Sequence, residues 1–491
     1  MSKNDKNKII GAESDANVTL SEVRLDTEEA RKEEAERKRV AKYRMMTEEK
    51  VPDVIVKLSI PTIISMLVTA FYNSADTFFV GRISNSATAA VGIVFSVMAI
   101  IQAFGFMCGH GSGNYMARML GAGETKEASD TASTGFAMSL IIGAVLAALG
   151  IIFREELAVV LGATKTSMKD TIDYMTIILL AAPVTMAQFV VNNQLRFQGS
   201  AVYAMVGLMV GAVINVALDP LFIFGFHMGV RGAALATASG QLISFIVLFI
   251  GSRKGGNIKM HLRNVHLNFH YIKEILNGGL PSLFRQGLAA AATMLLNSAS
   301  GRLGGDAAIA GMSIVSRTML IVSCALIGFG QGFQPVCSFN YGAGLKNRVR
   351  EGYFFCVRIG TVFLSVMAVL CFVFSAQIVR FFRNSDDVVA VGKVALRYQA
   401  VTLPLMATIV ITNMLLQSIG MGVRASVTAS ARSGIFFIPL ILTLPHFFGI
   451  TGVEVSQAIA DACAFILAIP LVVPVLRGLK KPTEASAGNE T

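Results

Sequence analysis

Charged residues are scarce in this 491-residue sequence, since Asp, Glu, Lys and Arg together make up only 15% of it. A soluble globular chain carries about 25% charged residues. Hydrophobic residues make up 54%, and the mean hydropathy is +0.62. They stand in long, nearly uncharged blocks rather than in short periodic stripes. This arrangement argues against soluble domains and predicts membrane-spanning segments.

Motifs for catalysis and nucleotide binding are missing as well. The sequence has no G-x-x-x-x-G-K-[ST] loop, no G-x-S-x-G nucleophile and no H-E-x-x-H pair. Its six cysteines lie in apolar blocks without a C-x-x-C pair, which favours reduced packing residues over a metal site or disulfides. These absences argue against a nucleotide-driven pump, indicate that the chain is not an enzyme and predict no organic cofactor.

Twelve apolar blocks are each long enough to cross a bilayer as a helix, which takes about 18 or more residues. They contain Gly, Pro, Ser and Thr throughout, as packed helices in lipid do. They show none of the alternation of a membrane β-barrel. The sequence therefore predicts an all-α integral membrane protein. The blocks lie near residues 58–80, 90–115, 131–152, 171–193, 202–225, 231–252, 275–300, 306–332, 353–378, 396–418, 426–447 and 453–476.

Two features of the second block are interpreted as packing. Gly105, Gly109 and Gly113 are spaced four apart, which suits a close approach between helices. His110 is the ionisable side chain of that block. A hydrogen-bonded packing role is favoured for it over a proton relay.

The sequence also matches itself weakly when it is shifted by about 220 residues. Pro61 then falls on Pro281, Asn192 on Asn413 and "GAG" at 121 on "GAG" at 342. Each copy holds six blocks, and an even number of crossings keeps both copies in the same orientation. The repeat is therefore parallel, and it predicts two six-helix bundles around a shared central cavity.

Lysine and arginine indicate the orientation, because basic loops face the cytoplasm. The tail and the segment 251–273, which joins the two sets of blocks, are both basic. Both termini of a multi-pass protein of the cell membrane are thus expected in the cytoplasm. The net charge of +11 and pI of about 9.4 then reflect membrane orientation, and no nucleic-acid partner is expected.

Five parts are expected along the chain. The first is a polar, charged tail whose acid–base pairs at helical spacing favour a solvated helix without a catalytic role. The parts are a cytoplasmic tail (1–57), an N-terminal bundle (58–252), a basic linker (253–274), a C-terminal bundle (275–476) and a cytoplasmic C-terminal tail (477–491).

Two acids stand within the N-terminal bundle. Asp219 lies in "GAVINVALDPLFIFG", one turn after Asn215, and Asp76 lies near the outer end of the first block. With Thr237 of the sixth block, these residues are expected at similar depth in the outer half of the bundle. Acids within a membrane mark ion or proton sites by default. Two carboxylates with amide and hydroxyl oxygens suit a small hard cation, and a close carboxyl pair can instead hold a proton.

The repeat provides an internal control for this interpretation. Asp76 falls on Leu296, Asp219 on Pro439 and Thr237 on Gln457, while Asn215 falls on Ile435. The second bundle therefore lacks the constellation, so packing of the shared fold does not require it. The alternative is that Asp219 caps a helix break at Pro220.

With these residues in place, the chain resembles the multidrug and toxic compound extrusion (MATE) family over about residues 58–476, and most closely its bacterial multidrug efflux branch. The match rests on "YNSADTFFVGR", "RFQGS", "NVALDPLFIFGFHMGVRGAALATASGQ", "GLPSLFRQG" and "FGQGFQPVCSFNYGAG" together with the repeat of six plus six helices. The resemblance implies a monomeric antiporter that exports organic cations or drugs in exchange for Na⁺ or H⁺.

The family's cation site carries over to Asp76, Asn215, Asp219 and Thr237, with Tyr72 as an aromatic neighbour one turn before Asp76. Acids that some members carry in the seventh and tenth helices are absent here, which leaves a second-bundle site in doubt. A lipid-linked precursor flippase of the same superfamily, with a strongly cationic cavity, stays open, as does a membrane receptor or enzyme. Because the blocks begin near residue 58, removal of residues 1–45 is expected to leave transport largely intact.

Overall fold

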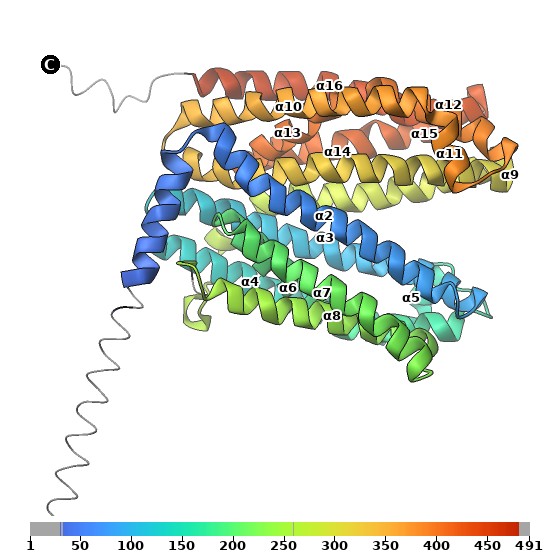
Figure 1. Cartoon of the computed structure of the whole chain (residues 1–491), viewed down its shortest axis with the longest axis horizontal. Coiled ribbons are helices and arrows are strands. Elements are labelled where there is room, and N and C mark those ends of the chain that lie inside the picture. The colour runs from blue at the N-terminus through green and yellow to red at the C-terminus, as the bar shows by residue number, and fades with distance from the viewer. Residues whose placement is uncertain (1–29, 31–32, 259, 481–491) are drawn as a thin grey trace, which may run out of the picture.

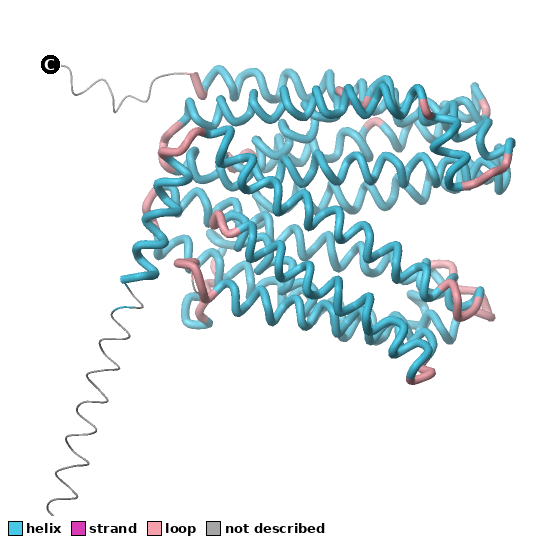
Figure 2. The backbone as a smooth tube through the Cα atoms, in the orientation of Figure 1, coloured by secondary structure: helices cyan, strands magenta, loops and turns pink. Residues whose placement is uncertain are grey.

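The computed structural model describes residue 30, residues 33–258 and residues 260–480. Within this part of the chain every regular element is a helix and no strand occurs, as the tube in Figure 2 shows. The predicted all-α fold is confirmed.

The first bundle contains six long helices within the described residues, together with the short α5 (Arg154–Val160). Its helices begin where local caps favour them: Ser84, for example, accepts a hydrogen bond from the Ala87 N–H at 3.0 Å before α3. The long helices are α2 (Val51–Val80), α3 (Asn85–Gly121), α4 (Thr125–Ile152), α6 (Met168–Phe197), α7 (Ala201–Pro220) and α8 (Gly229–Ser252).

The second bundle starts with α9 (Phe269–Gly342), which is two helices joined at Gly305. This glycine has φ 57° and ψ −153°, a conformation closed to other residues, and the chain turns back there. The side chain of Asn268 caps the first half by accepting from the Tyr271 N–H at 3.2 Å. The remaining helices are α10 (Lys346–Val373), α11 (Ser375–Phe382), α12 (Asp386–Thr402), α13 (Leu405–Ser418), α14 (Gly422–Ser430), α15 (Phe437–Phe448) and α16 (Ile450–Gly478).

The predicted number of membrane spans agrees with these helices. Among the described residues, 10 helices are long and apolar enough to cross a membrane, and the bent pair α12–α13 makes an eleventh. Because α9 contains two spans, the described residues supply all twelve. Large apolar side chains such as Val213, Ile246 and Val362 are exposed on the outside of the bundles, where lipid would cover them.

The block 396–418 is not the single straight helix that the sequence predicts. The α12 and α13 helices meet at a bend of 57°. Pro404 explains the break, because its nitrogen carries no hydrogen for the carbonyl of Ala400 and its ring clashes with the preceding turn. The N–H of Leu403 donates to the Ala400 carbonyl instead, at 3.3 Å.

The internal repeat is visible in individual hydrogen bonds. Asn192 of α6 donates to the carbonyl of Ala204 at 2.9 Å. Asn413 of α13 donates to the carbonyl of Ala425 at 2.7 Å. In each bundle this hydrogen bond connects the end of one helix to the start of the next, so the two aligned asparagines have the same structural role.

Figure 1 shows the two bundles close together at one end and further apart at the other. We call the close end the tail end, because the segment that precedes α2 and the C-terminus of α16 lie there. The opposite, far end carries α5 and α11.

Helices α3 and α9 form the main contact between the bundles toward the tail end. A Cβ atom at Gly342 would lie only 1.9 Å from the carbonyl oxygen of Arg118, so the backbones touch here. Arg118 also forms an ion pair with Glu274 at 3.0 Å, with both side chains mostly buried. This end of the molecule is therefore packed shut.

Two further predictions about the second block are confirmed. Cβ atoms at Gly105, Gly109 and Gly113 would come within 3.1, 2.8 and 2.3 Å of α6 side chains, so the glycines do allow close packing. His110 is buried and its Nδ1 atom lies 2.9 Å from the Ser282 hydroxyl of α9, which makes it a hydrogen-bonded contact between bundles.

A helix over residues 33–47, the tail helix, lies across the tail end. The Lys42 ammonium donates to the hydroxyl of Ser200 at 2.7 Å on the first bundle. The carbonyl of Met46 accepts from Asn340 at 2.9 Å and from Arg348 at 3.2 Å on the second bundle. The tail helix thus joins both bundles and is more than a solvated appendage.

Candidate cation site and central cavity

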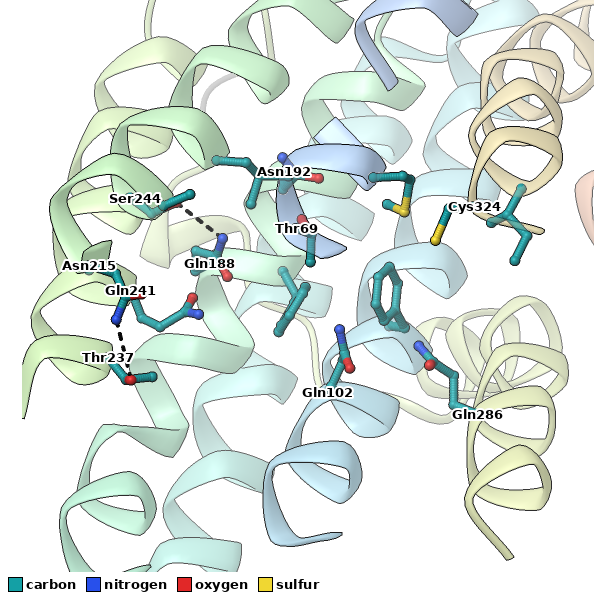
Figure 3. Close-up of a pocket in the computed structure, with 18 of the residues that line it drawn as sticks. Thr69, Gln102, Gln188, Asn192, Asn215, Thr237, Gln241, Ser244, Gln286 and Cys324 are labelled. Atoms are coloured by element: carbon teal, nitrogen blue, oxygen red, sulfur yellow. Dashed lines mark hydrogen bonds between the residues drawn. The ribbon is translucent and has the colours of Figure 1, made fainter. Parts of the chain in front are cut away.

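A cavity of about 280 Å³ lies between the first bundle and α9. Helices α2, α3, α6, α7 and α8 line one side of it, and both halves of α9 line the other. Figure 3 shows its polar side chains pointing inward among aromatic rings. A second cavity of about 330 Å³ lies within the second bundle, and Arg285, Gln286, Leu320 and Ile327 line both. The two cavities therefore adjoin along α9.

Three of the predicted site residues come together on α7 and α8. Asn215 and Thr237 both line the first cavity, and Asn215 Nδ2 donates to Thr237 Oγ1 at 3.4 Å, as Figure 3 shows. Asp219 is fully buried, one helical turn further along α7. Helical spacing places it on the face that carries Asn215.

The other two predicted residues, Asp76 and Tyr72, belong to α2. Their side chains fall in the stretch 72–78, which lies outside the described side chains. The membership of both residues in the site therefore stays a prediction.

The residues present fit a small cation or a proton. The Asn215 Oδ1 atom is buried and accepts no hydrogen bond from any described residue. A buried acceptor oxygen beside a buried carboxylate and a hydroxyl is the oxygen-rich environment that Na⁺ requires. A carboxyl group in the same place can carry a proton instead.

The helix does become irregular directly after Asp219. Helix α7 ends at Pro220, and residues Leu221–Gly225 form one wider turn with a bond from the Phe226 N–H to the Leu221 carbonyl at 2.9 Å. Such π-turns are frequent at functional sites, and the second bundle has one as well, at Ala431–Ile435. The helix break that Pro220 suggests is therefore present, directly after Asp219.

The second bundle has a different arrangement at the matching position. Arg432 Nε lies 2.7 Å from Asp461 Oδ1, and Gln457 donates to the same oxygen at 2.8 Å. Gln457 is the residue that aligns with Thr237. The guanidinium of Arg432 therefore neutralises Asp461. The sequence predicts that the second bundle has no copy of the Asp76, Asn215, Asp219 and Thr237 set. It does not predict the Arg432–Asp461 ion pair.

Several cavity residues were not among the predicted site residues. Gln188 Nε2 donates to Ser244 Oγ at 3.1 Å, and Gln102 and Gln241 also face the cavity. Each is an amide side chain within an apolar block. Because polar groups in lipid are costly, such side chains could have been predicted to line a cavity. The same holds more strongly for Arg285.

Comparison with known proteins agrees with this architecture. The family model MatE matches the chain twice, over residues 61–221 and 281–443. The multidrug export protein MepA of Staphylococcus haemolyticus (strain JCSC1435) is 28% identical over 421 residues, which cover 84% of this chain and 91% of that protein. MepA of Staphylococcus aureus (strain MSSA476) is 27% identical, with coverages of 86% and 93%.

A solved structure of a multidrug resistance MATE family transporter in an outward-facing conformation is 25% identical. It superimposes with a TM-score of 0.83 and covers 90% of this chain and 99% of that one.

Two repeated helical bundles around a shared cavity define a multi-pass membrane transporter. The chain belongs to the MATE family of multidrug efflux transporters, since the family model matches well over half of its residues. The two matched stretches begin at Pro61 and Pro281, the pair that marks the repeat in the sequence.

Proposed function

We propose that the chain exports drugs, including organic cations, across the cell membrane in antiport with Na⁺ or H⁺. It would act as a monomer, because one chain supplies both bundles and the cavity between them. The observation that carries the antiport is the buried set Asn215, Asp219 and Thr237, two of whose members also line the drug-sized cavity. Ion and drug sites that share residues can influence each other's occupancy directly.

The structure is then the outward-facing form, provided that the tail end lies in the cytoplasm. The contacts of Arg118 with Glu274 and of Gly342 with Arg118 close that end. A cation that binds one form more tightly than the other shifts the equilibrium between them by that difference in affinity. Asp219 provides the group whose occupancy differs between the forms.

The flippase alternative is less well supported. A lipid-linked precursor with several phosphate charges calls for a strongly cationic cavity, whereas amides and apolar side chains make up most of this lining. The MepA relatives are multidrug export proteins.

The test is efflux of ethidium by variants at matched membrane levels. Asp219→Asn keeps the side-chain size and removes the charge, so it should lower driven efflux by at least about 10-fold without loss of folded protein. Asp76→Asn should impair efflux comparably. Glu454→Gln is the matched control, because Glu454 is a buried acid of α16 that lines neither cavity. The coupling ion is the one whose gradient must be intact for efflux, which ionophores that collapse the Na⁺ or the H⁺ gradient would reveal. Efflux by Asp219→Asn at the wild-type rate would disprove the proposal.

A further inference from the structure

The charges that line the two cavities are all positive in the described part of the chain. In the first cavity Arg285 is the charged lining residue, and in the second Arg285 is joined by Arg432. No described carboxylate lines either cavity, and Asp461 is paired with Arg432. A permanent cation entering this space meets a like charge.

The two arginines differ in how their charge is balanced. Arg432 is paired with Asp461 at 2.7 Å. Arg285 has no hydrogen bond or ion pair with any described side chain. It stands on the shared wall of the two cavities, so its guanidinium borders both.

A second guanidinium adds to the positive field at this wall. Arg196 of α6 is almost fully buried and donates to Gln331, which lines the first cavity with Arg285. Its other hydrogen bond goes to the Asn193 Oδ1 atom, so no carboxylate neutralises it among its described partners. The amides fix Arg196 in place and leave Arg285 as the donor with free bonding capacity.

A guanidinium that borders a mostly apolar cavity and has no carboxylate beside it keeps its N–H donors available for an anionic ligand. A guanidinium presents two parallel N–H donors that match a carboxylate. Around it the cavity offers the rings of Phe95, Phe106 and Phe189 and the amides of Gln102 and Gln241. This lining fits a flat amphipathic molecule that carries a carboxylate.

We propose that Arg285 binds the carboxylate of the transported molecule, so that the chain prefers carboxylate-bearing, zwitterionic or anionic amphipaths over permanent monocations. The proposal rests on the export function above and specifies its substrate class. The amino group of a zwitterion would face the amide-lined wall toward α7 and α8. A small inorganic anion offers related chemistry at Arg285, and the experiment separates the two.

The test compares a fluorescent fluoroquinolone with its methyl ester, which keeps the rings and the amine but masks the carboxylate. Binding of both compounds and of ethidium is measured on the full-length chain in lipid nanodiscs. The wild type should bind the acid about 10-fold or more tightly than the ester. Arg285→Gln should abolish this difference while binding of ester and ethidium is kept or improved.

Two variants control for charge and for position. Arg285→Lys should restore part of the difference, because the charge remains but the two-pronged geometry is lost. Arg358→Gln removes an exposed arginine of α10 that lines neither cavity, and should behave as the wild type.

Equal binding of acid and ester by the wild type would overturn the proposal. So would equal losses for acid, ester and ethidium in Arg285→Gln, since that result indicates a structural role. If replacing chloride by methanesulfonate, which has no carboxylate, weakens acid and ester alike, the ligand of Arg285 is an inorganic anion. Binding needs no ion gradient, so Asp219→Asn should keep the acid–ester difference even though it stops driven efflux. A failure of antiport is thus distinguishable from a failure of carboxylate recognition.

Discussion

Close contacts between individual backbone atoms hold the tail end shut. At Gly342 the missing side chain lets α9 reach the carbonyl of Arg118 in α3, and at Gly121 it lets α3 reach the carbonyl of Phe339. Backbone atoms cannot rotate out of the way as a side chain can, so each of these sites excludes even a methyl group. The equilibrium between forms closed and open at the tail end should therefore depend on single glycines, Gly121 and Gly342, whose side chain is one hydrogen atom.

Replacing Gly342 with alanine should shift the protein toward forms that are open at the tail end. The new Cβ would lie 1.9 Å from the Arg118 carbonyl oxygen. Overpacking of this kind costs about 1–3 kcal/mol, which changes the ratio of forms by about 5- to 150-fold. Spin labels at Lys126 and Asn347, one on each bundle, should report longer distances.

Gly287→Ala is the control for this experiment, because a Cβ there meets nothing within 4 Å and the residue belongs to the same α9. If Gly342→Ala gives the same distances as Gly287→Ala, the close contact does not hold the closed form.

Among the elements, the tail helix departs furthest from its expected role. It contacts Ser200 on one bundle and Asn340 and Arg348 on the other. A helix that joins both bundles at the closed end stabilises that form over any form in which the bundles separate there. The expectation that removal of residues 1–45 leaves transport largely intact stays a prediction. That removal would delete most of the tail helix, whose contacts lie at the closed end.

The docking of this helix should depend on pH through Lys42. Burial lowers the pKa of the Lys42 ammonium from 10.5 to about 8. The docked tail helix therefore favours the neutral form of Lys42. The affinity of the tail helix for the two bundles should rise as the pH rises from about 8 to 10.5, and it should not change with pH below about 8. Labels at Arg37 and Asn347 should show a narrower distance distribution at pH 9.5 than at pH 7.

Lys42→Met provides the control, because it removes the titrating group. A pH response that survives in Lys42→Met has another origin.

At the scale of the whole molecule, the sequence predicts the architecture well because membrane physics fixes it. The lengths of the apolar blocks predict the twelve spans. The matching order of Pro61 and Asn192 with Pro281 and Asn413 predicts the repeat. The Asn215–Thr237 contact was also predicted, since periodicity and depth place both on one wall. The bend between α12 and α13 could have been predicted as well, because a proline such as Pro404 inside a helix breaks or kinks it.

Contacts between distant segments were beyond the sequence. The Arg432–Asp461 pair joins residues on different elements, and only the packing of α16 brings them to 2.7 Å. The tail helix reads as solvated because its charges are periodic, whereas its docking depends on Lys42 and on backbone carbonyls. Arg285 was visible as an arginine within a helix, but its place between two cavities follows from the fold alone.

The orientation of the whole molecule gives a prediction that labelling can check. Basic segments at the tail end should keep that end in the cytoplasm. A cysteine in place of the exposed His261, in a background without the native cysteines, should resist an impermeant reagent added to intact cells. A cysteine in place of the exposed Val160 of α5, at the far end, should react. Reaction at position 261 in sealed cells would invert the topology.

The guanidinium of Arg432 has an electrical consequence. Its positive charge is part of the chain, so under the proposed antiport Asp461 needs no exchanged ion, and one cation is exchanged in the first bundle. If a zwitterion of zero net charge leaves while one cation enters, each cycle carries one positive charge inward. A potential of 100 mV, negative inside, then adds about 2.3 kcal/mol to the driving force, which is about a 50-fold gradient of drug. Vesicles with an imposed potassium diffusion potential should show zwitterion export that rises with voltage, and export indifferent to voltage would contradict single-ion exchange.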